Sequence, residues 1–408
     1  MINVKSEILP LKKVLLHRPG NELLNITPNN LKELLFDDIP YLKIAQMEHD
    51  AFTKILQENG VETIFIEDLM AEVLNDNPNL REPFIKQFII EGNVDSEYYT
   101  RLLIDYFNTN YKNNLALVNK LIEGVRLNEF PKEKTITLQD RLCDYNIDMV
   151  LNPLPNLYFQ RDPLAAIGNG VTINKMYSTT RCRETIFDEY IFKYHKDYRD
   201  TKIYFNRYSK DIIEGGDILN FSNEAIGIGI SQRTAPDSLE EVAKALFSDP
   251  GSTVKEVYGF MIPKSRAFMH LDTVFTQINY NQFTVHPQII GPMRVFKLTN
   301  NDNNLRIEEI NEQLDVILSK ILKIEKVELL PCGGGDLIAA QREQWNDGTN
   351  TLCIAPGKVI AYQRNEITNN YLKNNGIEVL EMPSCELSRG RGGPRCMSMP
   401  FIRQENEK

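Results

Sequence analysis

From Leu154 onward the chain repeats one short pattern: an apolar strand runs into a polar or glycine-rich corner with an acidic residue, and a hairpin follows. The four copies read LPNLYFQRDPLAAIGNGVTI, IIEGGDILNFSNEAIGIGI, FMHLDTVFTQINYNQFTV and ELLPCGGGDLIAAQREQWNDGTNTLCIA. Their marker aspartates are spaced 55, 55 and 64 residues apart, and a cysteine follows 60 residues later (Asp162, Asp217, Asp272, Asp336 and Cys396). Steps this regular indicate repeats of a single supersecondary unit.

Helical segments are expected between these corners. Residues 237–249 combine an aspartate cap, early acids and apolar residues at helical spacing, and residues 304–324 and 367–375 have a similar pattern. The repeating unit is therefore α/β. If the corners serve one site, the units must be arranged radially, as in a propeller, so that the corners meet near an axis. LKKVLLHRPG near the start then supplies a strand of the module that the Cys396 segment completes.

One region breaks the period. His17 and Asp162 are 145 residues apart, far more than one step. Residues 41–59 are expected to form the first module's own helix. Residues 76–148 contain PFIKQFIIEG, SEYYTRLLIDYFN and NLALVNKLIEGVR, each with glycine or asparagine nearby as a stop, and we interpret them as an inserted helical bundle. The whole chain, 1–408, is then one catalytic domain with this insertion.

Composition excludes several classes of protein. Apolar residues make up 42% and charged residues 25%, as in folded globular proteins. The net charge of −10 argues against nucleic acid as the main partner. No stretch has the length and apolar character of a signal peptide or membrane span, so no membrane partner is expected. Six scattered cysteines without a CxxC pair fit reduced thiols, and the expected location is cytoplasmic.

The corners also carry the groups capable of chemistry. In an extended segment, side chains at i and i+2 share a face, so His270 and Asp272 are expected to point into one space. Such a pair is often only a hydrogen-bonded structural histidine, and His and Asp at this spacing also occur in metal sites. Of the other histidines, only His17 lies at a corner.

Two glycine-rich segments need an explanation. EGGD at Glu214 is either a simple turn or a place where paired glycines let a ligand approach closely. LSRGRGGPRCMSMP places Cys396 beside three arginines, Arg389, Arg391 and Arg395, which would favour the thiolate. The alternative is a flexible basic tail with an incidental cysteine.

Six motifs in order, NLYFQRDP, IEGGD, ISQRT, MHLDTVFT, REQWNDGTN and RGRGGPRCMSMP, closely resemble the arginine deiminase family of guanidine-modifying enzymes. The resemblance covers essentially the whole chain, including the helical insertion. It implies a five-bladed α/β propeller with pseudo-fivefold ββαβ-type modules. Gln160 and Cys182 differ from the residues commonest in the family at these positions, and Cys182 adds a second thiol flanked by arginines.

The resemblance also implies the site. Cys396 would be the nucleophile and His270 the general acid and base. Asp162 and Asp272 would clamp a guanidinium, with Glu214 beside them. Residues implied to hold the substrate are the α-carboxylate ligands Asn156, Arg181 and Arg233, the packing residue Phe159, and Arg391 as a gate.

The implied reaction is hydrolysis of L-arginine to L-citrulline and ammonia through an amidino-cysteine intermediate, without metal or organic cofactor. Planar N–H groups fit two carboxylates edge to edge, and a thiolate can attack the exposed face. Three carboxylates raise the pKa of the thiol, whereas a bound guanidinium and a protonated His270 lower it, so we expect substrate or imidazolium charge to help ionise Cys396.

Several alternatives remain open at this point. On the same fold they are an agmatine deiminase, a dimethylargininase and an amidinotransferase; Arg181 and Arg233 argue against the first. A non-catalytic arginine-binding protein and a metal-dependent hydrolase using His270 and Asp272 are the others. L-arginine is the expected small-molecule partner, and a homo-oligomer is expected.

Overall fold

The computed structural model describes residues 1–94, 96–130, 149–263, 268–301 and 304–404. Within these ranges, five sheets share one pattern of pairing: an antiparallel pair of strands, then a third strand that runs parallel to the second. A helix precedes the third strand in each sheet. The recurrent sequence pattern therefore corresponds to a recurrent α/β unit.

The first sheet joins the two ends of the chain. Strand β1 (Leu11–Leu16) pairs antiparallel with β19 (Met399–Arg403) and parallel with β2 (Glu62–Phe65), which follows helix α1 (Leu42–Glu58). The prediction that the first strand is completed by the Cys396 segment is confirmed by this pairing.

The remaining four sheets follow in chain order. The second contains β5 (Leu164–Ile167), β6 (Gly170–Ile173), α7 (Glu184–Tyr194) and β7 (Lys202–Phe205). The third contains β8 (Ile218–Asn220), β9 (Ala225–Ile230), α8 (Pro236–Ser248) and β10 (Glu256–Met261), extended by β13 (Pro292–Asn301) and β14 (Asn304–Gln313). The fourth contains the short helix α9 (Leu271–Val274), β11 (Phe275–Gln277), β12 (Gln282–Val285), α10 (Leu314–Leu322) and β15 (Glu328–Pro331). The fifth contains β16 (Leu352–Ala355), β17 (Lys358–Tyr362), α12 (Glu366–Asn374) and β18 (Glu378–Met382), preceded by α11 (Leu337–Trp345).

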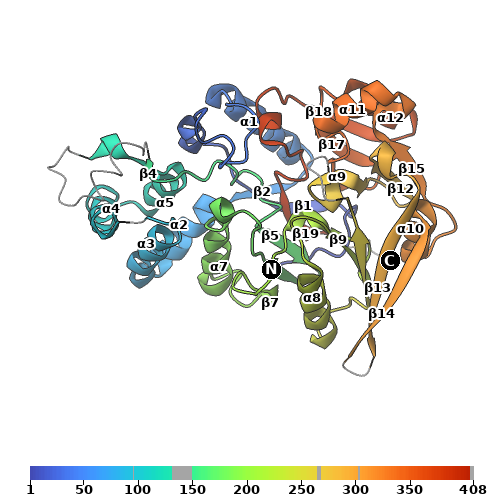
Figure 1. Ribbon diagram of the computed structural model, residues 1–408, viewed down its shortest axis with the longest axis horizontal. Helices are drawn as coiled ribbons and strands as arrows, with labels where there is room; N and C mark the ends of the chain where they lie inside the picture. The colour runs from blue at the N-terminus through green and yellow to red at the C-terminus, as the bar shows by residue number, and fades with distance from the viewer. Residues whose placement is uncertain (95, 131–148, 264–267, 302–303, 405–408) are drawn as a thin grey trace.

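A group of helices lies to one side of the sheets (Figure 1). It comprises α2 (Ile66–Asp76), α3 (Arg81–Ile90), α4 (Glu97–Asn110) and α5 (Asn114–Glu123), followed by the two-stranded pair β3 (Val125–Arg126) and β4 (Met149–Leu151). Phe84 and Phe88 of α3 pack against Phe187 of α7, so these helices share a core with the second sheet. Part of the predicted insertion, residues 131–148, lies outside the described residues.

Three segments differ from the sequence predictions. Residues 304–313 were expected to be helical, but they form β14, paired with β13 over ten residues, and only Leu314–Leu322 is helical. Asp336 is not a site corner: its side chain caps α11 by accepting from the Ala339 N–H at 2.7 Å. The hairpin of this fourth copy does not follow Asp336 directly but lies beyond α11, as β16–β17.

Among the described residues, the helices are all too short or too polar to serve as membrane-spanning segments.

Candidate active site

A cavity of about 460 Å3 lies among the corner segments of the sheets. Eight of the ten predicted site residues line it: Asn156, Phe159, Asp162, Arg181, Arg233, His270, Arg391 and Cys396. The remaining two, Glu214 and Asp272, are fully buried and contact His270 and Cys396 respectively. The structure thus brings all ten into one neighbourhood.

The cysteine loop is ordered by close packing, so it is not a flexible tail. Its glycines lie where a side chain would collide: a Cβ on Gly392 would lie 2.3 Å from Phe159, and one on Gly393 would lie 2.5 Å from the Asn350 carbonyl oxygen. The Cys396 N–H donates to Asn350 Oδ1 at 3.0 Å. These contacts fix the thiol at the cavity wall, five residues after Arg391, which has a left-handed backbone (φ 63°).

The Cys396 thiol lies 3.7 Å from Asp272 Oδ2. Burial, and then the Asp272 and Asp162 carboxylates, raise the pKa of this thiol well above its usual value, and the Arg395 guanidinium only partly opposes them. Of the three arginines near the cysteine, Arg395 is the one that points inward, to the buried carboxylates of Asp272 and Glu7. The sulfur is therefore a neutral thiol near pH 7 while no cation occupies the cavity.

His270 lies between two acids. Its Nε2 is 2.7 Å from Glu214 Oε2 and its Nδ1 is 3.6 Å from Asp162 Oδ1. Burial lowers the pKa of His270, but the Asp162 and Glu214 charges outweigh burial and raise the pKa to about 9. The ring is an imidazolium at neutral pH, and it can deliver a proton.

The two glycines after Glu214 create space for this arrangement. A Cβ on Gly216 would lie 2.5 Å from His270 Nδ1, and a Cβ on Gly215 would lie 2.1 Å from the Arg161 carbonyl oxygen. The close approach predicted for this segment is therefore made by the protein's own histidine and backbone. Glu214 also accepts from the Tyr177 N–H at 3.0 Å and from Arg233 Nη1 at 3.1 Å. Burial would raise the pKa of Glu214, but Arg233 and His270 lower it, so Glu214 is an anion.

Asp162 and Asp272 have the same bonding pattern. Asp162 Oδ2 accepts from Arg181 Nη1 at 2.6 Å, and Asp272 Oδ2 accepts from Arg395 Nη1 at 2.8 Å. The other oxygen of each carboxylate, Oδ1, is buried and has no hydrogen-bond partner among the described residues. Because an unpaired buried carboxylate oxygen is costly, these two atoms are suited to accept N–H groups from a bound cation.

The predicted carboxylate ligands are engaged with acids of the protein. Arg181 also pairs with Glu184, through Nη2 at 2.8 Å, and Arg233 pairs with Glu214. Burial lowers the pKa of Arg181, but Glu184 and Asp162 raise it, so the side chain stays charged. A substrate carboxylate must therefore compete for these two guanidinium groups.

The other predicted substrate contacts have defined positions. Asn156 donates to the Leu34 carbonyl oxygen at 2.7 Å, and the Phe159 ring packs on the cysteine loop. Arg391 stacks on the Trp345 ring at 3.6 Å from the guanidinium carbon to the ring centroid. His17, the corner histidine, bonds Glu22 and Glu67 and does not line the cavity.

Asp162, Glu214 and His270 have ligand atoms close enough together to hold a metal ion. However, Arg181 and Arg233 already neutralise the two acids, and a protonated His270 has no lone pair to offer. This donor set fits an imidazolium better than a metal ion, and the absence of a metal stays a prediction.

Several residues support the site in ways that were not predicted from the sequence. Asn350 holds the cysteine backbone, Glu184 holds Arg181, and Arg395 links Asp272 to Glu7. Glu184 could have been found, since it lies three residues after Arg181 at the start of a helix. Glu7 carried no signal, because it lies 388 residues from its partner.

Solved structures show which enzymes share this fold. An amidinotransferase from Microseira wollei matches with a TM-score of 0.56 and 13% identity, over 99% of this chain and 98% of that chain. DDAH from Pseudomonas aeruginosa, complexed with citrulline, matches with a TM-score of 0.53 and 14% identity, over 96% of this chain and 100% of that chain. The α/β fold is therefore the pentein fold of amidinotransferases and DDAH.

The sequence comparisons are more specific. The profile described as "Arginine deiminase" matches residues 32–403. Arginine deiminase of Treponema denticola is 54% identical over 99% of both chains, and that of Clostridium perfringens is 50% identical over 99% of this chain and 98% of its own. The chain belongs to the arginine deiminase family.

Proposed function

We propose that this protein hydrolyses L-arginine to L-citrulline and ammonia through a covalent intermediate on Cys396. The observation that carries the proposal is the convergence, in one cavity of a family member, of a thiol, an imidazolium and two half-paired aspartates. The enzyme is then a hydrolase of C–N bonds in linear amidines, acting in arginine metabolism.

The first contacts with the substrate are electrostatic, between its guanidinium and the buried aspartates. The guanidinium of the substrate donates to the Oδ1 atoms of Asp162 and Asp272, which accept no hydrogen bond from the described residues; this fixes its plane and presents one face to the sulfur. Arg181 and Arg233 hold the α-carboxylate together with Asn156, and Phe159 packs along the side chain. The bound cation lowers the pKa of the Cys396 thiol, whose proton is released, so the thiolate forms when there is a substrate to attack.

In the first half of the reaction, Sγ forms a bond to the guanidinium carbon and the bond from that carbon to a terminal nitrogen breaks. His270 gives its proton to the departing nitrogen, which leaves as ammonia. In the second half, water adds to the amidino carbon while His270 accepts one of its protons. The carbon–sulfur bond then breaks as the remaining hydroxyl proton passes to the sulfur, which restores the thiol and releases citrulline. Glu214 keeps His270 oriented and charged.

The direct test is rapid quench with labelled arginine, followed by mass spectrometry of the peptide that contains Cys396. We expect the label on Cys396 within the first turnover, loss of turnover in Cys396→Ala, and nearly full activity in Cys182→Ala. Label on another residue would refute the nucleophile. Parallel assays with agmatine and methylated arginine test the activities of the other enzymes that share the fold. Of the three substrates, arginine should be hydrolysed fastest.

We further propose that the five sheets close radially into a five-bladed propeller around the cavity, with residues 76–148 as a helical insertion in a single catalytic domain, 1–408. The repeated pairing pattern and the β1–β19 contact support this closure. A cytoplasmic location and a homo-oligomer stay predictions; the five described cysteines are all free thiols, which is consistent with a reducing compartment.

A further inference from the structure

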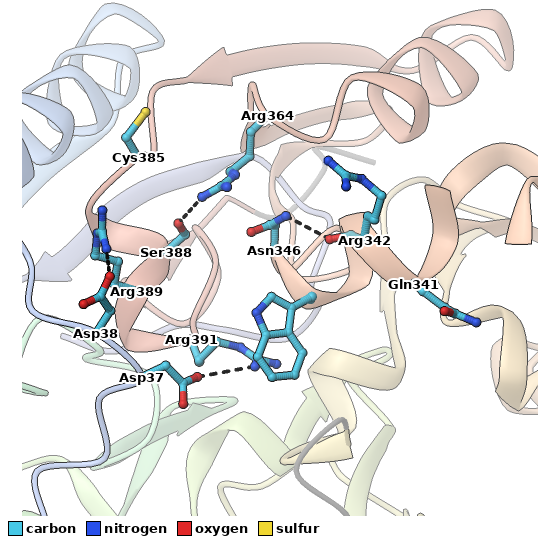
Figure 2. Close-up of a pocket in the computed structure, with 11 residues that line it drawn as sticks. Asp37, Asp38, Gln341, Arg342, Asn346, Arg364, Cys385, Ser388, Arg389 and Arg391 are labelled. Carbon is cyan, nitrogen blue, oxygen red and sulfur yellow. Dashed lines mark hydrogen bonds and ion pairs between the residues drawn. The ribbon is translucent and has the colours of Figure 1, made fainter. Parts of the chain in front are cut away.

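A second cavity, of about 690 Å3, is lined by the residues drawn in Figure 2 and adjoins the active-site cavity through two shared side chains. Its walls come from α11, the turn after β17, the cysteine loop and the segment at Asp37 and Asp38. Asp37 and Arg391 line both this outer pocket and the active-site cavity. The two cavities therefore share a wall made of these two side chains.

In the shared wall, Arg391 makes a cation–π contact and an ion pair. Arg391 stacks on Trp345, and its Nη1 lies 3.5 Å from Asp37 Oδ2. Trp345 is half-exposed and is the sole tryptophan of the sequence. The indole thus reports on the boundary between the two cavities.

The outer pocket has an excess of positive charge. Its two acids are already paired, Asp38 with Arg389 and Asp37 with Arg391. In contrast, within the described part of the chain Arg342 has no ion-pair partner, and Arg364 donates only to Ser388 Oγ, at 2.7 Å. Both arginines border the pocket (Figure 2), and both residues are exposed to solvent. They are suited to bind a carboxylate.

The inner cavity has the opposite character beside Cys396, where Asp162 and Asp272 each have a buried oxygen that no described residue hydrogen-bonds. A molecule with a cation at one end and a carboxylate at the other is therefore oriented by the two cavities together. Its cationic end is drawn inward and its carboxylate is left among the outer arginines.

We propose that the outer pocket is a second binding site, specific for the α-carboxylate of an amino acid, at which Arg342 and Arg364 hold the substrate as it enters and the product as it leaves. This inference rests on the proposed function. Citrulline has a neutral ureido group in place of the guanidinium, so its side chain loses the inward attraction once the reaction is complete, while its carboxylate still fits the outer arginines. The outer pocket then selects amino acids over their decarboxylated analogues before they reach the inner site.

The test compares the double variant Arg342→Gln/Arg364→Gln with a matched control, Arg199→Gln/Arg306→Gln, which removes two exposed arginines outside both pockets. L-citrulline is titrated while Trp345 fluorescence is recorded, and its decarboxylated analogue, N-carbamoylputrescine, is titrated in the same way. We expect citrulline affinity to fall about tenfold in the double variant, which corresponds to about 1.4 kcal/mol, and to stay unchanged in the control. The analogue should bind the unchanged protein about tenfold more weakly than citrulline.

Turnover gives a second readout. In the double variant, kcat/KM for arginine should fall about tenfold while kcat stays unchanged, because neither arginine touches the inner cavity. A double variant that matches the control in both measurements overturns the proposal, as do equal affinities for the two probes or a Trp345 signal that citrulline leaves unchanged. If the double variant does not fold, Arg342→Gln alone carries the same test. Failure of the proposed function is separately visible, as no citrulline formed from arginine by the unchanged protein.

Discussion

At the scale of single residues, each clamp aspartate has a divided role. One oxygen is bound by a buried arginine, and the other is left for the substrate. The arginine partners, Arg181 and Arg395, are themselves held by Glu184 and Glu7. The carboxylates are therefore preorganised before the substrate arrives, and little reorganisation is needed when it binds.

Replacing a clamp residue, as in Asp162→Ala or Asp272→Ala, should leave the buried guanidinium of the substrate unpaired on one side. The expected loss is about 2–5 kcal/mol, or roughly 30- to 4000-fold in kcat/KM. Steady-state citrulline assays measure it. Asp336→Ala is the matched control, because this exposed aspartate only caps α11; it should cost about 1 kcal/mol of stability and leave kcat/KM unchanged. A clamp variant that loses only about twofold would refute the clamp.

The pH dependence of the reaction should follow His270. Its pKa is raised to about 9, so the proton needed by the leaving nitrogen is present below pH 9 and is lost as the pH rises through that value. We expect kcat/KM to decline on the alkaline side near pH 9. Glu214→Gln removes one of the charges that raise this pKa, so the decline should move to lower pH. The charge-matched surface variant Glu224→Gln should leave the profile in place, and a profile that is identical in Glu214→Gln would contradict the role of Glu214.

At the scale of secondary-structure elements, local sequence patterns predicted what local interactions determine. The helices expected at 41–59, 237–249 and 367–375 form as α1, α8 and α12, since apolar residues at helical spacing suffice to place them. Asp237 is not the cap that was predicted, because α8 begins at Pro236 and Asp237 lies in its first turn. Residues 304–313 were wrongly predicted because their spacing also fits a helix, and only the partner strand β13 decides the outcome. Asp336 was wrongly predicted to mark a corner of the site, because aspartate is common both at helix N-caps and in acidic turns.

The end of β1 shows how one side chain can join several elements. His17 Nδ1 lies 2.9 Å from Glu67 at the start of α2, and its Nε2 lies 3.2 Å from Glu22. Burial lowers the pKa of His17, but the two glutamates raise it to about 10. This imidazolium therefore holds β1, the segment at Glu22 and α2 together.

We predict that His17→Gln destabilises the protein by about 3–5 kcal/mol at pH 6, since it leaves two glutamates without their cation. The folded-state pKa is above the unfolded value of 6.5, so this stabilisation is fully present below pH 6.5 and is lost as the pH rises through about 10. Urea unfolding of both proteins at pH 6 and pH 10 measures the difference. A gap that is larger at pH 10 than at pH 6 would show that His17 is not held as a cation.

At the scale of the whole molecule, the site depends on the two ends of the chain. Nine of the ten predicted site residues lie in the six local motifs, and Arg181 was implied by the resemblance alone, but the sequence could not predict the pairs that orient them. Glu7 binds Arg395 through both carboxylate oxygens at 3.1 Å, and Arg395 binds Asp272. The N-terminal segment thus supports a clamp aspartate in the middle of the chain through the residue that precedes the nucleophile.

This arrangement makes Glu7 a determinant of stability in acid. Burial raises the pKa of Glu7, but Arg395 and Arg161 outweigh burial and lower it to about 2, against 4.5 in the unfolded chain. The stabilisation from the Glu7 charge is therefore complete above pH 4.5 and is lost as the pH falls through 2.

We expect Glu7→Gln to lower the free energy of unfolding by about 3–5 kcal/mol at pH 7, because the Arg395 cation stays buried with one acid fewer. The difference in this free energy between the variant and the unchanged protein should narrow towards pH 2. Urea unfolding across this pH range measures the gap. Glu62→Gln, which breaks the partly exposed Lys13–Glu62 pair between β1 and β2, should cost at most about 1 kcal/mol. Equal losses in the two variants would mean that the Glu7–Arg395 pair does not join the chain ends to the site.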